Sequence, residues 1–266
     1  MNSGRKDWRK AGAIVTGASS GIGEALALRL AQEGARVVLV ARREVELERV
    51  ANMIRDAGAE AHVLPCDLSD VRAASIAGEE AERLLGPSGV DILINNAGYG
   101  GHKRVVDWPL DEIERMTTVN YLSSVAFTKA VLPGMLKRGS GSLVFVASVA
   151  GKVPVPLEAP YAATKSALLA FGEATSYEVE DKGISVLCVC PGVIDTAFFM
   201  EEDLAVMPSV AKRGMVPVEG LVDTVFRALA RGRREVTYPA SIATAYPVKA
   251  LAPRFFHRAV KKKTSS

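Results

Sequence analysis

The chain has few of the residues that build disulfide-rich or metal-centred proteins. Its 266 residues include three cysteines and three histidines. Cys66, Cys188 and Cys190 are too few for a disulfide framework, and they lie in apolar, strand-like surroundings without a set of metal ligands. We therefore expect buried, reduced thiols and no metal site.

Long apolar runs are also missing. No stretch forms an uninterrupted apolar span of about 18 residues, and the start of the chain is charged, without the apolar core of a secretory signal. Hydrophobic residues make up 48% and charged residues 24%, which is typical of a globular protein rather than a disordered one. We expect a cytoplasmic protein.

Acidic residues are absent after Glu235. The net charge of the whole chain is only +3, and we expect no nucleic-acid partner. Basic and apolar residues alternate in the final segment, residues 239–266: Lys249, Leu251, Arg254, Phe255, Phe256, Arg258, Val260, Lys261, Lys262 and Lys263. This basic extension is either a solvated tail or a segment that makes peripheral contact with an anionic membrane surface.

Short apolar runs alternate with longer helical patterns along the rest of the chain. The expected strands are 13–16, 36–41, 61–66, 91–95, 142–148 and 184–190, and the expected helices are 22–33, 44–57, 69–85, 110–136 and 161–181. The alternation predicts an α/β, doubly wound fold with a mainly parallel sheet and helices on both faces. We expect one catalytic domain over residues 1–238.

A glycine-rich turn follows the first expected strand. Thr16–Gly23 reads TGASSGIG, with the spacing G-x3-G-x-G rather than the more familiar G-x-G-x-x-G. Missing β-carbons let such a turn approach a pyrophosphate, and the following helix directs its amino end towards the anion. The turn therefore predicts a dinucleotide site.

The end of the second expected strand indicates which dinucleotide binds. An acidic residue at this place binds the ribose 2′-hydroxyl of NAD, whereas arginine favours the 2′-phosphate of NADP. Ala41 stands where the acid is expected, and Arg42 and Arg43 follow it. We expect NADP, with NAD less favoured.

Polar residues also follow the third and fourth expected strands. Asp67 and Leu68 end one, and Asn95–Gly98 end the other, at the edge where ligands bind in such folds. Asp67 either contacts the adenine or caps the next helix.

Tyr161 and Lys165 are spaced to share one face of a helix, and Ser148 precedes them at the end of an apolar run. A phenol is a weak acid near neutral pH unless a neighbouring ammonium stabilises its phenolate, and Lys165 is placed to lower the pKa of Tyr161 in this way. The three residues predict proton transfer at a carbonyl oxygen.

Taken together, these motifs resemble the short-chain dehydrogenase/reductase family, from Ala13 to about Tyr238. The resemblance implies a Rossmann fold and hydride transfer between a nicotinamide and a carbonyl or alcohol. It implies a catalytic set of Asn120, Ser148, Tyr161 and Lys165, in which Ser148 and Tyr161 bind the substrate oxygen and Asn120 holds a water linked to Lys165. The implied cofactor contacts are Gly17, Ser19, Ser20, Gly21, Ile22, Gly23, Arg42, Arg43, Asp67, Leu68, Asn95, Ala97, Gly98, Tyr161, Lys165, Pro191, Gly192, Ile194 and Thr196.

Two apolar segments suggest the substrate. Residues 149–160 should form one wall of the pocket, and residues 193–217 supply a lid. The apolar lid side chains are Phe198, Phe199, Met200, Leu204, Met207 and Met215. An apolar ketone, aldehyde or alcohol fits these surroundings, and His102 is expected at the border of the pocket. Alternatively, the apolar side chains serve packing within the lid or contacts between subunits.

A small-residue stripe in the Tyr161 helix points to self-association. Ala163, Ala167, Ala170 and Ala174 recur at helical spacing and form either an internal packing face or the contact of a homodimer or homotetramer. The competing functions are an NADPH-sensing regulator and a membrane-surface binding protein, both with little turnover.

Overall fold

The computed structural model describes residues 8–196 and 214–264. Seven strands in these ranges form one sheet in the order β3-β2-β1-β4-β5-β6-β7, and every neighbouring pair is parallel. The strands are β1 (Gly12–Thr16), β2 (Arg36–Ala41), β3 (Ala61–Pro65), β4 (Ile92–Asn95), β5 (Gly141–Val146), β6 (Ile184–Pro191) and β7 (Glu235–Tyr238). This confirms the doubly wound α/β fold.

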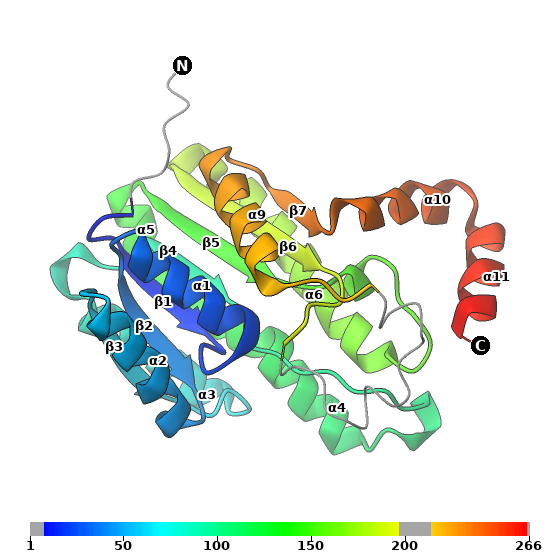
Figure 1. The fold of residues 1–266 in the computed structure, drawn as a ribbon, viewed down its shortest axis with the longest axis horizontal. Helices are drawn as coiled ribbons and strands as arrows, with labels where there is room; N and C mark the ends of the chain where they lie inside the picture. Colours follow the sequence, from blue (N-terminus) through cyan, green and yellow to red (C-terminus); the bar gives the residue numbers. More distant parts are fainter. Residues whose placement is uncertain (1–7, 197–213, 265–266) are drawn as a thin grey trace.

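Helices cover both faces of the sheet (Figure 1). They are α1 (Gly21–Gln32), α2 (Glu44–Asp56), α3 (Val71–Leu84), α4 (Leu110–Thr117), α5 (Ser123–Arg138), α6 (Ala159–Val179), α9 (Val218–Ala230), α10 (Ala245–Leu251) and α11 (Pro253–Thr264). Core residues of α1, α2 and α9 pack in one cluster with β1 and β2, and those of α3, α5 and α6 pack in a second.

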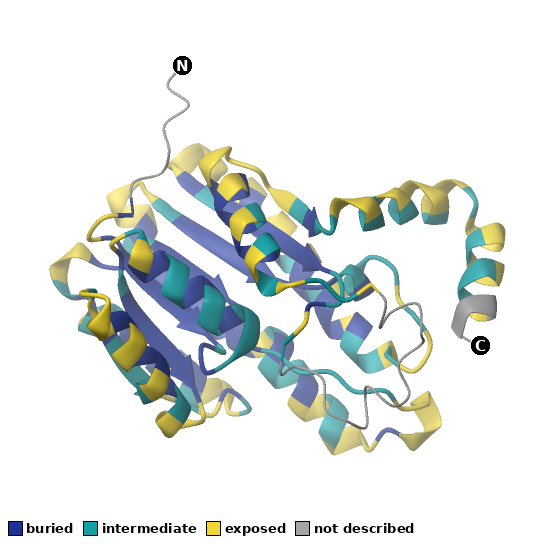
Figure 2. Cartoon of the chain, in the orientation of Figure 1, coloured by how far each residue is buried: buried dark blue, intermediate teal, exposed yellow. Residues whose placement is uncertain are grey.

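Alternation along the strands explains the two layers of core. In β2, Val37 and Leu39 belong to the first cluster, whereas Val38 and Val40 belong to the second. All four are fully buried, so the strand is apolar at successive positions. Figure 2 shows the same pattern as a buried sheet beneath helices with exposed outer faces.

The order of the strands determines where a ligand can enter. The chain runs outwards from β1 to β3 and then returns to β4 on the other side of β1. In doubly wound sheets, ligands bind at the carboxyl ends of the strands on either side of such a reversal, which here are β1 and β4. The glycine-rich turn and Asn95–Gly98 follow these two strands.

The expected helix over 110–136 is wrong in its continuity. The structure has α4, a π-helical turn η3 (Thr118–Leu122) and then α5. Thr117 and Thr118 donate their hydroxyls to the carbonyl oxygens four residues earlier, of Ile113 and Glu114. A wider turn of this kind redirects the side chains within it, and Asn120 lies at its centre.

The three cysteines are free thiols, but only two are buried. Cys188 and Cys190 lie in β6, and burial raises the pKa of each to about 12. Cys66 is partly exposed because it lies just after β3, at the edge of the sheet. The expectation of buried thiols is therefore wrong for this residue.

Candidate active site

The glycine-rich turn has no room for side chains at two positions. Gly17 has a φ of +66°, which favours glycine, and an added Cβ would lie 2.9 Å from the Cα of Ala97. An added Cβ on Gly23 would overlap the carbonyl oxygen of Gly17. Ser20 caps α1 in position but makes no side-chain hydrogen bond to the helix backbone. These features fit a dinucleotide phosphate at the amino end of α1.

Arg43 reaches the same turn. Its Nη2 donates to the hydroxyls of Ser19 and Ser20, both at 3.3 Å. Arg42 acts on Asp67 instead, because its charge adds a small lowering of the pKa of that carboxyl to the effect of the hydrogen bonds from Ser69. Two cations therefore flank the position after β2, and this arrangement fits a phosphate on the adenosine ribose.

Asp67 is not the cap of α3, which corrects one of the two alternatives for this residue. Its Oδ1 accepts hydrogen bonds from the backbone and hydroxyl of Ser69, at 3.0 and 2.9 Å. These bonds lower its pKa. Asp70 caps the helix instead, accepting from the amides of Arg72 and Ala73. Leu68 is buried in the second core cluster, so its side chain packs inwards.

The residues after β4 are tied to the end of β1. Asn96 donates from Nδ2 to the carbonyl oxygens of Thr16 and Gly17, at 3.0 and 3.3 Å. The hydroxyl of Thr16 accepts from the amides of Asn96 and Ala97. Asn95 is buried and donates to Thr128. These hydrogen bonds therefore hold the segments after β1 and β4 together.

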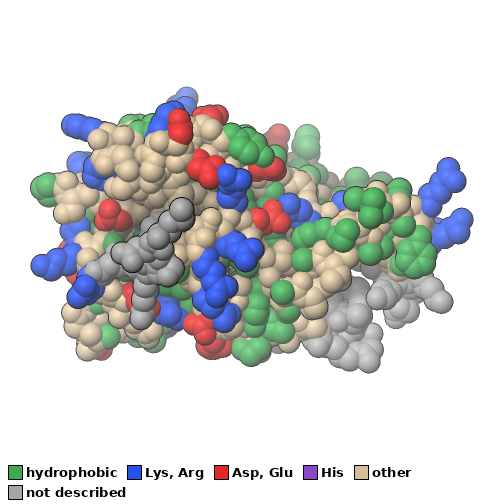
Figure 3. Space-filling model, turned by 90° about the horizontal axis from the view of Figure 1, so that it is seen from above, with side chains coloured by type: hydrophobic (Ala, Val, Ile, Leu, Met, Phe, Trp, Pro, Cys, Tyr) green, Lys and Arg blue, Asp and Glu red, His purple; other side chains and the backbone are tan. Residues whose placement is uncertain are grey.

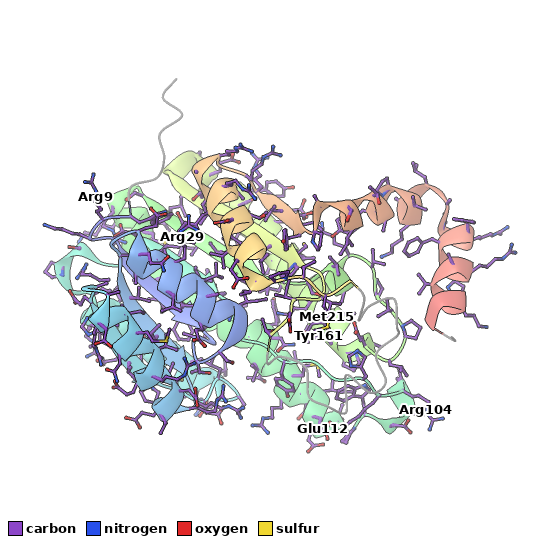
Figure 4. All side chains as sticks on the ribbon, in the orientation of Figure 1. Arg9, Arg29, Arg104, Glu112, Tyr161 and Met215 are labelled. Atoms are coloured by element: carbon purple, nitrogen blue, oxygen red, sulfur yellow. The ribbon has the colours of Figure 1, made fainter. Side chains whose placement is uncertain are left out.

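Tyr161 and Ser148 meet at the carboxyl edge of the sheet. Tyr161 lies in the first turn of α6 (Figure 4), and its phenol is hydrogen-bonded to the hydroxyl of Ser148, which follows β5. Ser148 also accepts from the amide of Ala150 at 3.1 Å. This places a phenol and an alcohol side by side where one substrate oxygen can contact both.

Burial pushes the pKa values of Tyr161 and Lys165 in opposite directions. The pKa of Tyr161 is raised chiefly by burial; the bond with Ser148 opposes this and the charge of Glu158 adds to it. Burial lowers the pKa of Lys165 to about 8. Lys165 is not a cause of the shift at Tyr161, so our expectation that it lowers this pKa is wrong for the protein by itself.

Lys165 is held beneath the tyrosine. Its Nζ donates to the carbonyl oxygen of Val146 at 2.9 Å and lies 5.8 Å from the centre of the Tyr161 ring. An added Cβ on Gly98 would lie 3.1 Å from this Nζ and 3.2 Å from the Oδ1 of Asn120. The structure therefore brings Lys165 and Asn120 together around Gly98.

Asn120 bonds to protein groups on two sides. Its Oδ1 accepts from the amide of Tyr99, and its Nδ2 donates to the carbonyl oxygen of Tyr99, both at 2.9 Å. Nδ2 also donates to the hydroxyl of Thr164 at 3.0 Å. Asn120 thus fixes the segment after β4 against α6. That Asn120 also holds a water linked to Lys165 stays a prediction.

The segment after β6 faces the glycine-rich turn. An added Cβ on Gly21 would lie 3.2 Å from the Cβ of Thr196. Gly192 donates its amide to Tyr238 at 2.7 Å, and Ile194, buried in the first core cluster, forms a bridge with Val216. Pro191 ends β6. Of the expected lid, 197–213 lies outside the described residues, including Phe198, Phe199, Met200, Leu204 and Met207.

Comparisons with known proteins agree with this geometry. The short chain dehydrogenase family model matches residues 11–206. The chain belongs to the short-chain dehydrogenase family. A solved short-chain dehydrogenase from Sphingobium yanoikuyae in complex with NADPH is 30% identical, with a TM-score of 0.80 over 92% of this chain and 94% of that one.

Two insect relatives are similar in sequence. A dehydrogenase/reductase SDR family protein 7-like from Anopheles gambiae is 36% identical over 94% of this chain and 82% of its own length. One of the same name from Drosophila melanogaster is 44% identical over 69% of this chain and 57% of its own length. The chain therefore spans just over half of the Drosophila relative.

Sequence reasoning gave no individual role to three residues of this short-chain dehydrogenase site, although Thr16 and Asn96 lie in the expected motifs 16–23 and 95–98 and Glu158 lies in the expected wall 149–160. Thr16 and Asn96 join the glycine-rich turn to β4, and the only signal for Asn96 was its place in an asparagine pair. Glu158 lies three residues before Tyr161 and acts on its pKa. Its spacing on the chain was visible, but its burial was not, because that depends on the segment after β4.

Proposed function

We propose that this protein is an NADPH-dependent reductase of apolar ketones or aldehydes that also oxidises the corresponding alcohols. The observation that carries the proposal is the hydrogen-bonded pair of Tyr161 and Ser148, with the buried ammonium of Lys165 beneath it. NADPH supplies the hydride when bound. Ser148 orients the substrate oxygen, and Tyr161 donates a proton to it in reduction.

The residues proposed to hold NADPH lie at the carboxyl edge of the sheet. Gly17, Ser19, Ser20 and the first turn of α1 contact the pyrophosphate, and Arg42 with Arg43 bind the 2′-phosphate. The further proposed contacts are Gly21, Ile22, Gly23, Asp67, Leu68, Asn95, Ala97, Gly98, Pro191, Gly192, Ile194 and Thr196. Lys165 and Tyr161 bind the nicotinamide ribose, and Asn120 holds a water that links Lys165 to solvent.

The proposed substrate class follows from the wall of the site. Between Ser148 and Tyr161 the chain reads VAGKVPVPLEAP, and Val153, Val155 and Leu157 are partly exposed there. An apolar carbonyl compound would cover these side chains, whereas a sugar or an acid would find few partners among them. The alternative, an NADPH sensor, needs no proton donor at this place.

The decisive experiment compares Tyr161→Phe with wild type on a panel of carbonyls and alcohols, using NADPH and NADH. Loss of the phenolic hydroxyl should lower kcat by about 10²- to 10⁴-fold while NADPH binding is retained. Tyr177→Phe is the matched control, because it removes an exposed phenol from the same helix. Wild-type rates in Tyr161→Phe would refute the role, and binding without turnover in wild type would favour the sensor.

We also propose that residues 239–266 act as a unit distinct from the catalytic domain 1–238 and contact an anionic membrane surface. Helices α10 and α11 extend away from the sheet (Figure 1), and Figure 3 shows apolar side chains on this arm with cations at its end. Leu251 is 87% exposed and Phe255 68%. An anionic lipid surface would bury the apolar side chains and attract the cations.

A second copy of the arm is a poor occupant of this surface. No acidic residue follows Glu235, so two arms would repel each other. None of the described helices is long and apolar enough to span a bilayer. The proposed location is the cytoplasm, with contact at the membrane surface through the arm.

Self-association is proposed through α6. Ala163, Ala170 and Ala174 are exposed and Ala167 is half-buried, so the stripe is not used for packing within the described chain. A flat face of small residues allows close approach of another helix. We therefore propose a homodimer or homotetramer that buries this face.

A further inference from the structure

The segment from Tyr99 to Arg104 connects two parts of the site. Tyr99 is held by Asn120 through two hydrogen bonds. At the other end, the amide of Lys103 donates to the carbonyl oxygen of Leu157 at 3.0 Å. This segment therefore joins the π-helical turn to the residues that precede α6.

One side-chain contact strengthens this connection. The Nε2 of His102 lies 2.8 Å from the Oε1 of Glu158, and the two side chains are only 8% and 19% exposed. Glu158 is the N-cap residue of α6, and its carbonyl oxygen accepts from the amide of Ala162 at 2.8 Å. The pair therefore acts on the turn of helix that carries Tyr161.

The backbone beside Glu158 is strained. Leu157 has a φ of +71°, a left-handed conformation that branched side chains rarely adopt and that persists only where surrounding contacts impose it. Its carbonyl oxygen is the acceptor for Lys103. The strained Leu157 and the paired Glu158 therefore belong to one junction, four and three residues before Tyr161.

Burying these two polar side chains costs solvation free energy, which their contact with each other offsets only in part. Glu158 also acts on the reacting group, because its charge helps to raise the pKa of Tyr161. The groups around the phenol are Ser148 after β5, Glu158 before α6 and Lys165 within α6, and His102 reaches it through Glu158.

We propose that His102 and Glu158 are positioning residues for the carbonyl reduction, because the contact between their side chains fixes the amino end of α6 against the segment after β4 and so places the Tyr161 phenol beside Ser148. This inference rests on the proposed function. It adds to that function two side chains outside the proposed catalytic set of Asn120, Ser148, Tyr161 and Lys165.

The test uses His102→Gln, Glu158→Gln and the double variant. Each single change should lower kcat by about 10- to 100-fold, because small displacements of a reacting group have effects of this size; the KM for NADPH should stay within about twofold. The double variant should lose no more than the worse single one, since both remove the same contact. In Glu158→Gln the alkaline limb of the kcat profile for reduction should also move to lower pH, because a charge that raises the pKa of Tyr161 is removed.

A matched control is available in His62 and Glu60. This pair has the same chemistry, with Nε2 and Oε1 2.7 Å apart, but is more exposed and lies at β3. His62→Gln and Glu60→Gln should leave kcat and its pH profile unchanged.

Hydrogen exchange of the Ala162 amide gives a readout that needs no turnover. It should accelerate in both His102→Gln and Glu158→Gln and stay unchanged in the control variants. Unchanged exchange with kcat within twofold of wild type would overturn the inference, as would an increase in KM alone. If Tyr161→Phe is inactive while the His102 and Glu158 variants behave as wild type, only this inference fails. If wild type reduces no carbonyl, the proposed function fails. Hydrogen exchange of the Ala162 amide then still tests whether the contact between His102 and Glu158 holds the amino end of α6.

Discussion

Tyr161 and Lys165 show how neighbouring groups acquire different chemistry from burial. The phenol is kept protonated by its surroundings, and Ser148 is its hydrogen-bond partner. The ammonium has a pKa of about 8, so it can exchange protons near neutral pH. A pair with pKa values pushed apart is typical of acid and base roles, and a protonated phenol is the form that donates the proton in the proposed carbonyl reduction.

Arg42 and Arg43 carry the prediction for coenzyme choice. Arg42→Ala and Arg43→Ala should each weaken NADPH binding by about tenfold or more, because a hydrogen bond to a charged group contributes about 1.5–3 kcal/mol. NADH binding should change little. Binding can be followed by fluorescence of the reduced nicotinamide, with the exposed Arg231→Ala as control. Equal losses for NADPH and NADH would count against a phosphate contact.

At the scale of elements, helix α6 has two faces with separate uses. One face carries Tyr161 and Lys165, and the opposite face leaves Ala163, Ala170 and Ala174 exposed. The i, i+4 spacing was enough to predict the first face. The spacing could not predict the use of the alanine face, because that depends on whether another helix of the same chain covers it.

Ala170→Glu tests the proposed subunit contact. A carboxylate at this exposed position is tolerated in a monomer but would be buried without a partner in an α6 interface, so we expect dissociation to smaller species. Sedimentation velocity measures the change. Val45→Glu, at another exposed site on α2, should leave the mass unchanged. An unaltered oligomer in Ala170→Glu would place the interface elsewhere.

The α10–α11 arm gives a second prediction at this scale. Wild type should co-sediment with vesicles that contain phosphatidylglycerol and less with pure phosphatidylcholine, and the binding should weaken with salt. Leu251→Ser, Phe255→Ser and Arg258→Ser should each weaken vesicle binding several-fold. The first two remove apolar surface that would be buried in the lipid, and the third removes a basic residue, which contributes about 1 kcal/mol. Val106→Ser is the control, because Val106 is 84% exposed on another part of the surface. If the arm variants change oligomer mass and not vesicle binding, the occupant is a second copy.

At the scale of the whole molecule, the buried Lys165 should cost stability. Its pKa falls from 10.5 to about 8, a difference that corresponds to about 3 kcal/mol. Below pH 8 the folded and unfolded chains both carry the proton and the cost is full. Between about pH 8 and 10.5 the folded protein releases it first, so the cost declines as pH rises.

Lys165→Met should therefore raise the free energy of unfolding by about 1–3 kcal/mol at pH 7, with a smaller gain near pH 10, while activity is lost. The loss of the bond to Val146 reduces this gain. Urea unfolding at both pH values measures it. Lys137→Met, at an exposed position, should change stability by less than about 0.5 kcal/mol. A destabilised Lys165→Met at pH 7 would show that the ammonium strengthens the fold.

Local sequence predicted most elements because their signals are local. The strand expected at 13–16 is Gly12–Thr16, and the helix expected at 22–33 is Gly21–Gln32. The π-helical turn was missed because the hydrophobic period across 110–136 is nearly the same with or without one wide turn. The strand expected to reach Ser148 ends at Val146, the last residue in register with the partner β6.

The amino-acid sequence by itself determined the α/β alternation, the glycine-rich turn, and the spacing of Tyr161 and Lys165, since each depends on residues close together in the chain. Only the tertiary structure decided that Arg43 reaches Ser19 and Ser20, and that His102 pairs with Glu158. It also decided the direction of both pKa shifts at the site. Burial and long-range pairing depend on which segments the sheet brings together, and no local pattern contains that information.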